Sequence, residues 1–282
     1  MPRLLIAGCG YVGTAAADLF AASGWEVEGW TASEESARAL SDRPYDIRAA
    51  DFTTAPLSSG VPFDVVIQAA STRGGRAADY RRIYFAGARN LAAAFPQSLH
   101  IFASSTSVYA QTDGSWVTEE SAAEPATETG RILRETEELV LQRNGIVARL
   151  AGIYGPGRSA LLRKLLSGDA VIDPTERYVN QAHRDDIAAA LLCLSESTAR
   201  GQIYNISDGN PLLLRECYEW LAAELNKPVP PIALHSAERK RGRSNKRVSN
   251  DKLRALGWAP QFPTFESAMR NSILPNFATC GA

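Results

Sequence analysis

The sequence predicts an α/β fold: a doubly wound parallel sheet followed by a smaller C-terminal lobe. Short apolar runs alternate with helical patterns through the first two thirds of the chain. The first run breaks into a G-x-G-x-x-G turn at residues 8–13, and proline and glycine punctuate shorter pieces after about residue 153. Parallel strands buried on both faces need crossover connections, which normally place helices on both sides of the sheet.

The expected strands are short runs that lack the polar alternation of a half-exposed sheet. They are residues 4–7, 27–31, 45–49, 65–69, 100–104, 146–150 and 203–206. The helical patterns between them predict the crossover helices. These are residues 14–22, 34–41, 78–94, 131–143 and 185–197.

The glycine turn stands between the first strand and the first helix, which is the context of a dinucleotide-binding turn. Gly8 permits the tight turn, Gly10 has no side chain to block a pyrophosphate, and Gly13 lets the helix approach the strand. The free N–H groups of Tyr11 and Val12 then face the phosphates at the positive helix end. A plain structural turn is the alternative, and the strand–turn–helix context favours the dinucleotide.

Composition excludes several classes of partner. The formal net charge of -1 provides no global field toward nucleic acid or an anionic membrane. The sequence runs directly into its first strand, without a signal peptide or an apolar stretch long enough for a bilayer, which predicts a cytoplasmic protein. The 4 cysteines lack metal-ligand spacing, so we expect reduced thiols and no metal site.

Several segments, in order along the chain, resemble the extended short-chain dehydrogenase/reductases of the NAD-dependent epimerase/dehydratase type. They are residues 8–13, 64–71, 102–109, 149–158, 183–186 and 204–208. The resemblance implies a Rossmann-type NAD(P)-binding domain and a substrate-binding lobe, with substrate bound between them. The domain is expected over residues 1–152, completed by 178–207, and the lobe over 153–177 and 208–282.

The resemblance also assigns coenzyme contacts at the carboxyl ends of the strands. Besides the glycine turn, they are Thr31, Ser33, Asp51, Phe52, Ala69, Ala70, Ser71 and Ile153. An acid at the end of the second strand would bind the ribose of NAD and repel the 2′-phosphate of NADP. No acid occurs there before Glu34, so the sequence favours NADP, with NAD as the alternative.

The family's proton-transfer pair is missing. Related enzymes carry a tyrosine, and a lysine four residues later, on the helix after the fifth strand, where the lysine lowers the pKa of the tyrosine. Two alignments place Thr129 and Leu133, or Gly130 and Arg134, at those positions. The chain therefore resembles an atypical subgroup, similar to the YeeZ-like proteins, which keep the fold and the serine but not the Y-x-x-x-K pair.

Ser105 occupies the family's catalytic serine position. Its hydroxyl can donate one hydrogen bond to a carbonyl and polarise it, although it is a poor proton donor at neutral pH. Tyr154 and Tyr109 are the nearest phenols, and Tyr154 is the candidate second catalytic residue. The alternative, favoured by the usual packing of tyrosine, is that both are half-buried aromatics.

Two arginines on the same helix are candidate replacements for the lysine. Arg131 and Arg134 would keep their charge throughout a reaction. Their spacing from Glu135 and Glu138 is that of i,i+4 ion pairs on a solvent-facing side, and we prefer that interpretation.

Other charged residues divide into substrate contacts and structural groups. Arg158 and Arg247 suit recognition of an anionic substrate. His183, beside two aspartates, is interpreted as a helix start rather than a metal ligand or a triad. The basic stretch 239–247 has no interleaved aromatic residues, so a solvated loop is expected rather than a nucleic-acid site.

The predicted function is an NAD(P)-binding oxidoreductase, or an epimerase/dehydratase-like enzyme, in which Ser105 polarises the reacting group of a small polar substrate. The missing tyrosine and lysine leave a second hypothesis, a non-catalytic NAD(P) sensor or scaffold. Related folds often pair through the helices after strands four and five, so a homodimer is a further possibility.

Overall fold

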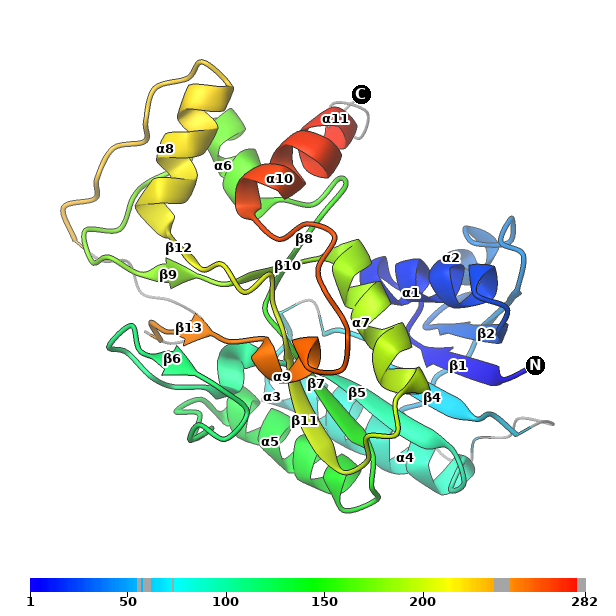
Figure 1. The fold of residues 1–282 in the computed structure, drawn as a ribbon. Helices are drawn as coiled ribbons and strands as arrows, with labels where there is room; N and C mark the ends of the chain where they lie inside the picture. The colour runs from blue at the N-terminus through cyan, green and yellow to red at the C-terminus, as the bar shows by residue number, and fades with distance from the viewer. Residues whose placement is uncertain (55–56, 58–61, 73, 236–243, 278–282) are drawn as a thin grey trace.

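The computed structural model describes the chain apart from residues 55–56, 58–61, 73, 236–243 and 278–282. A seven-stranded sheet forms its centre, in the order β11-β7-β5-β4-β1-β2-β3, and every neighbouring pair is parallel (Figure 1). The strands are β1 (Arg3–Ala7), β2 (Glu26–Thr31), β3 (Asp46–Ala49), β4 (Val65–Gln68), β5 (Leu99–Ser105), β7 (Ile146–Leu150) and β11 (Gln202–Ile206). The predicted doubly wound fold is confirmed.

Helices cover both faces of the sheet. Figure 1 shows α1 and α7 on one face and α4 and α5 on the other. The helices of this part are α1 (Tyr11–Ala22), α2 (Glu34–Arg38), α3 (Ala77–Tyr80), α4 (Gly87–Ala94), α5 (Glu128–Leu141) and α7 (Arg184–Glu196). The strand order reverses between β1 and β4, which creates the crevice where doubly wound sheets bind ligands.

The helix expected over residues 78–94 is divided by a π-helix, η1 (Arg81–Ala86), between α3 and α4. The amide of Gln68 accounts for the wider turn. Its Nε2 donates to the carbonyl oxygens of Ile83 at 2.8 Å and Tyr84 at 3.1 Å. A side chain from the end of β4 therefore satisfies backbone acceptors that a regular helix would have used.

The second lobe has its own small core above the carboxyl edge of the sheet. Its apolar cluster includes Tyr154, Leu162, Tyr218 and Phe265. Its elements are β9 (Tyr178–Val179), β12 (Leu212–Leu213), α6 (Ala160–Ser167), α8 (Leu214–Glu224), α10 (Phe265–Ala268), η3 (Met269–Ile273) and α11 (Leu274–Phe277). The paired strands β8 (Gly152–Tyr154) and β10 (Gln181–His183) join it to the sheet, and Ala182 of β10 packs in the main apolar core. The connecting elements are η2 (Thr106–Val108), β6 (Trp116–Val117), β13 (Arg247–Val248) and α9 (Asp251–Arg254).

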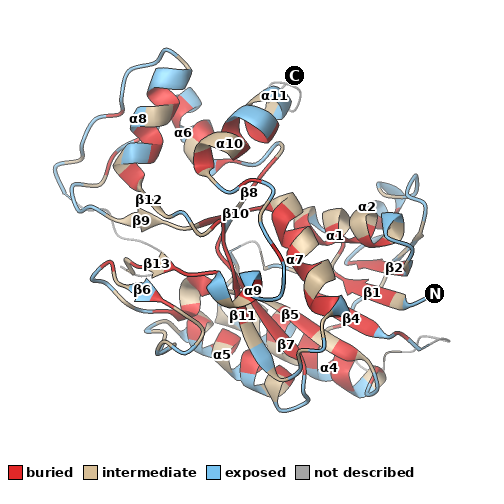
Figure 2. Ribbon diagram, in the orientation of Figure 1, coloured by how far each residue is buried: buried red, intermediate tan, exposed pale blue. Residues whose placement is uncertain are grey.

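The buried residues lie mainly in the central sheet and on the helix faces that pack against it. Every residue of β4 and of β7 is buried, and Figure 2 shows the buried residues concentrated in the sheet and on the inward sides of its helices. Central strands buried on both faces explain why these segments are uniformly apolar apart from a few paired groups. Within the described residues, no helix combines the length and apolarity needed to cross a membrane.

Candidate coenzyme and active site

The glycine turn has the geometry of a phosphate-binding loop. Gly8 has φ +113°, and a Cβ there would lie 2.4 Å from the backbone nitrogen of Ala70. A Cβ on Gly13 would lie 2.1 Å from the Gly8 carbonyl oxygen, whereas a Cβ on Gly10 would meet nothing within 4 Å. Two of the three glycines are therefore required by packing, and the space beside Gly10 is open for a ligand to approach.

The first turn of α1 carries no acidic residue, so its positive end is not neutralised locally. Ala69 donates its N–H to the carbonyl oxygen of Ala7 at 2.9 Å, which places the end of β4 directly beside the end of β1. The small side chains of Ala69 and Ala70 therefore border the glycine turn. The N-terminus of α1 can hold a diphosphate through its backbone N–H groups, and the two alanines leave room for it because they have little bulk.

The predicted adenosine contacts lie at the ends of β2 and β3. The Thr31 hydroxyl donates to the carbonyl oxygen of Ser33 at 3.1 Å, and Ser33 Oγ accepts from the N–H of Ser36 as the cap of α2. The Asp51 carboxylate accepts from the hydroxyl of Thr53, a bond that lowers its pKa. These groups shape the β2 and β3 ends of the site, with Asp51 ionised at neutral pH.

Phe52 is buried and forms the wall between the β3 end and the helix after β4. Its ring fills the space that a side chain on Gly87 would need, since a Cβ there would lie 2.5 Å from Phe52 Cε2. The amide of Asn90 donates to the carbonyl oxygen of Phe52 at 3.3 Å. Asp51 is thus held on a packed segment at the carboxyl edge of the sheet.

Ser105 ends β5 and caps the short helix η2. Its Oγ accepts from the N–H of Ser107 at 3.1 Å, which uses an acceptor lone pair and leaves the hydroxyl proton available to donate. In the sheet order, β5 is separated from β1 only by β4, and all three strands end at the same edge. A hydroxyl that is able to donate therefore lies at the edge that carries the glycine turn.

The helix α5 supplies neither a phenol nor an ammonium at the positions of the family's pair. Leu133 is buried in an apolar cluster with Tyr84 and Val147, and Gly130 packs against Pro125. Arg134 forms an ion pair with the buried Glu137, so its guanidinium is directed along the helix. Both alignments of the sequence thus place structural residues where related enzymes have catalytic ones.

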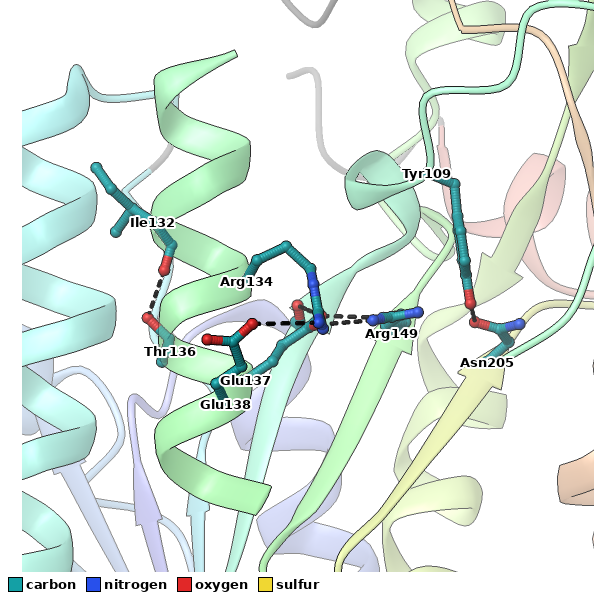
Figure 3. Close-up of polar contacts among 9 residues, drawn as sticks. Tyr109, Ile132, Arg134, Thr136, Glu137, Glu138, Arg149 and Asn205 are labelled. Carbon is teal, nitrogen blue, oxygen red and sulfur yellow. Dashed lines mark hydrogen bonds and ion pairs between the residues drawn. The ribbon is translucent and has the colours of Figure 1, made fainter. Parts of the chain in front are cut away.

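A buried polar network, which the sequence analysis missed, lies beside this helix (Figure 3). Glu137 is 0% exposed and accepts from Arg149 Nε at 3.0 Å, from Arg149 Nη2 at 2.7 Å and from Ser104 Oγ at 2.6 Å. The Arg149 guanidinium stacks on Tyr109, whose hydroxyl donates to Asn205 Oδ1 at 2.9 Å. The network joins α5 to β5, β7 and β11, and its member on β5 is Ser104, the residue before Ser105.

The expected solvent-side pairs on α5 form only in part. Arg134 reaches Glu138 at 3.5 Å as predicted, although its stronger partner is Glu137. Glu135 pairs with Arg81 of η1 at 2.8 Å rather than with Arg131. The Arg131 guanidinium donates to the carbonyl oxygen of Ala126 instead.

Tyr154 is 1% exposed and lies in the core of the second lobe. Its ring packs edge-on against His183 and stacks on Phe265, and its buried hydroxyl has no hydrogen-bond partner among the described residues. Burial raises the pKa of the phenol. This position disfavours the predicted catalytic role, because a group that reaches substrate must face the cleft. Tyr109 is likewise fully buried rather than half-buried.

His183 and Asp186 form the start of α7 and fasten the C-terminal segment. His183 Nδ1 accepts from the N–H of Asp185, and Nε2 lies 2.9 Å from Ser272 Oγ. Burial lowers the pKa of His183 to about 4, so the ring is neutral. The Asp186 carboxylate accepts from the N–H groups of Gln261 and Phe262. Within the described residues, no cluster of His, Cys, Asp and Glu could hold a metal ion.

The two predicted substrate arginines lie against aromatic rings. Arg158 Cζ is 5.2 Å from the ring centre of Tyr11, beside the glycine turn. Arg247 Cζ lies 5.2 Å from the ring centre of Trp116 and 5.0 Å from that of Tyr178. Each guanidinium is therefore positioned before any ligand binds.

Of the basic stretch 239–247, residues up to 243 lie outside the described part. Lys246 is buried, and its Nζ donates to the carbonyl oxygen of Tyr109 at 3.1 Å. Burial lowers its pKa to about 8. The expectation of a solvated loop is therefore wrong at Lys246, which links the C-terminal segment to the loop after β5, and at Arg247, which begins β13.

The glycine turn at the switch point, the serine at the end of β5 and the added lobe together define a dinucleotide-binding protein of the extended short-chain dehydrogenase/reductase class. The sequence profile of the NAD dependent epimerase/dehydratase family matches residues 4–207. The chain belongs to that family, as its motifs predicted.

Individual relatives agree with this assignment. Protein YeeZ of Escherichia coli (strain K12) is 28% identical, over 93% of this chain and 97% of that protein. A functionally unknown conserved protein from Silicibacter pomeroyi superposes with a TM-score of 0.81 and 25% identity, over 95% of this chain and 97% of that chain. The predicted similarity to YeeZ-like proteins is confirmed.

Enzymes of known reaction share the fold at lower identity. The dTDP-glucose 4,6-dehydratase from Bacillus anthracis, solved in complex with NAD, has a TM-score of 0.78 and 16% identity, over 96% of this chain and 95% of that chain. The UDP-glucose 4-epimerase from Thermotoga maritima, solved with UDP-glucose, has a TM-score of 0.80 and 15% identity, over 99% of both chains.

Proposed function

We propose that this protein is an NAD(P)-dependent oxidoreductase or epimerase/dehydratase-like enzyme that acts on a small polar substrate with an anionic group. The observation that carries the proposal is the position of Ser105 at the edge shared with the glycine turn, where its hydroxyl proton has no acceptor among the described residues. Ser105 donates a hydrogen bond to the reacting oxygen and polarises it. A bound nicotinamide coenzyme supplies the hydride acceptor or donor.

Several groups of this chain would hold the coenzyme. The open space at Gly10 and the N-terminus of α1 receive the diphosphate, while Ala69 and Ala70 admit it close to the sheet. Ser71 and Ile153 complete the predicted contacts. Thr31, Ser33, Asp51 and Phe52 border the adenosine end.

We propose a preference for NADP over NAD because no carboxylate follows β2 before Glu34. A carboxylate there would repel the 2′-phosphate. The test is the ratio of dissociation constants for NADPH and NADH in the wild type and in Ser33→Asp. The wild type should bind NADPH more tightly and the variant should bind NADH more tightly. A wild-type preference for NADH would refute the assignment.

Arg247 is the proposed receptor for the substrate's anionic group. Its Nε donates to the carbonyl oxygen of Gly114 at 2.8 Å, and two aromatic rings hold the guanidinium plane. No carboxylate pairs with it in the described part of the chain. A preorganised guanidinium with free Nη groups matches a carboxylate or phosphate. Since two fold relatives are named for dTDP-glucose and UDP-glucose, sugar nucleotides are the first probes to use.

The decisive experiment compares Ser105→Ala with a matched control, Ser107→Ala, in NAD(P)H-coupled turnover on carbonyl, imine and sugar-nucleotide panels. Loss of the polarising hydrogen bond should lower kcat roughly 100-fold and leave the coenzyme dissociation constant unchanged. The control should retain wild-type turnover. Wild-type kcat in Ser105→Ala would refute the catalytic role.

A non-catalytic NAD(P) sensor or scaffold is the second candidate. It is favoured by the residues of α5, where Leu133 is packed into a core and Arg134 is engaged by Glu137. Tight coenzyme binding without turnover across the same panels would select it. We also propose a homodimer through α4 and α5, which sedimentation velocity tests directly.

A further inference from the structure

Tyr11, the first residue of α1, carries two guanidinium groups on its ring. Arg158 Cζ lies 5.2 Å and Arg184 Cζ lies 5.1 Å from the ring centre. Arg158 follows β8, and Arg184 opens α7 directly after β10. Two positive charges from segments remote in sequence therefore meet beside the glycine turn.

The ring that carries them is fixed. The Tyr11 hydroxyl donates to the carbonyl oxygen of Pro156 at 3.0 Å. A Cβ on Gly155 would lie 2.6 Å from that hydroxyl, so only glycine leaves room for this contact. Burial raises the pKa of Tyr11 to about 12, so the phenol stays protonated and is a weak acid at neutral pH. Tyr11 is thus a rigid platform and not a substitute for the missing catalytic tyrosine.

The charges around this platform do not balance. Arg184 Nε donates to Asp185 Oδ1 at 2.8 Å, and this carboxylate orients the guanidinium. Arg158 is exposed and forms no ion pair with any described carboxylate. The first turn of α1 has no acid, and its helix end adds positive potential. Asp185 therefore pairs with Arg184, while Arg158 and the helix N-terminus have no counter-charge among the described residues, an arrangement that an anion would neutralise.

We propose that Arg158 and Arg184 bind the diphosphate of the dinucleotide coenzyme and complete the site that Gly10 begins. Guanidinium forks match phosphate oxygens in geometry and charge. The inference rests on the proposed coenzyme binding, and it reassigns Arg158 from substrate to coenzyme. It also gives Tyr11 a role for its side chain in addition to its backbone, because the ring holds both guanidinium groups at the phosphate-binding end of α1.

The test measures dissociation constants of NADH and NADPH by calorimetry for the wild type, Arg158→Gln and Arg184→Gln. Each variant should bind roughly 10- to 100-fold more weakly, the effect of losing a charge-assisted hydrogen bond. The increase in the dissociation constant should be the same for NADH and NADPH, because both coenzymes contain the diphosphate. Arg143→Gln is the matched control, since this exposed arginine follows α5 at the opposite edge of the sheet.

The outcomes separate this inference from the proposed function. If the wild type binds neither coenzyme, the proposed function itself fails. If the wild type binds and both glutamine variants bind equally well, only the arginine assignment is overturned. A loss confined to NADPH would overturn it too, because the arginines would then contact the 2′-phosphate. Should a glutamine variant melt at a lower temperature, Arg158→Lys and Arg184→Lys keep the charge without the fork and should show intermediate affinity.

Discussion

Replacing Glu137 by glutamine should destabilise the fold strongly, because it leaves a buried guanidinium without its counter-charge. Glu137 and Arg149 have side chains that are 0% and 1% exposed, and two hydrogen bonds of 3.0 and 2.7 Å join them. Breaking a buried pair by removing one partner costs roughly 3–5 kcal/mol. For a chain of this length we expect Tm to fall by about 6–10 °C.

The matched control is Glu138→Gln on the same helix. Glu138 is 59% exposed and meets Arg134 at 3.5 Å, so its loss should change Tm by about 1 °C or less. Thermal melts followed by circular dichroism at neutral pH measure both variants. The double variant Glu137→Met with Arg149→Met should recover part of the stability, because neither charge is then buried alone. The account is refuted if Glu137→Gln melts within 1 °C of the wild type.

Two further predictions follow from the glycine turn and from a buried acid. Gly13→Ala should lower Tm, because the added Cβ would lie 2.1 Å from the Gly8 carbonyl oxygen. Gly10→Ala should leave Tm unchanged, because its Cβ would meet nothing within 4 Å. Calorimetry should nevertheless find weaker coenzyme binding in Gly10→Ala, since the methyl group occupies the space proposed for the diphosphate. Burial raises the pKa of Asp208 from 3.8 to about 8, so the folded state holds a proton that the unfolded state releases. The contribution of Asp208 to stability should therefore fall as pH rises from about 4 to about 8, and between pH 6 and pH 8 urea titrations should show stability changing less favourably in the wild type than in Asp208→Asn.

The sheet could be predicted from the sequence because its strands are apolar on both faces. The run 146–150 was expected from its pattern, and β7 spans the same residues. The glycine turn was equally predictable, since the steric needs of Gly8 and Gly13 are local to β1, α1 and the end of β4. The π-helix was not, because it depends on the Gln68 amide reaching two carbonyls on a segment 15 and 16 residues later.

One feature of the sequence, the charged residue Arg149 within an apolar strand, could have predicted the buried network around Glu137. Arg149 interrupts an otherwise apolar strand, and a charge in a strand buried on both faces requires a partner. Glu137 lies four residues after Leu133 and three before Val140, which places it on the inward side of α5. Only the register of α5 against β7 brings the two charges together, and the sequence does not contain that register.

The packing of α5 limits how the missing tyrosine and lysine could be restored by substitution. Leu133 packs in a core with Phe102 and Val147, so a lysine there would be desolvated beside apolar side chains rather than paired. Arg134 is bound to Glu137, which Arg149 also requires. The site-facing part of α5 has therefore become structural. Under the proposed function, Ser105, the substrate itself or water carries the proton that α5 cannot handle, and this route predicts a catalytic rate that depends on substrate acidity rather than on a phenol of α5.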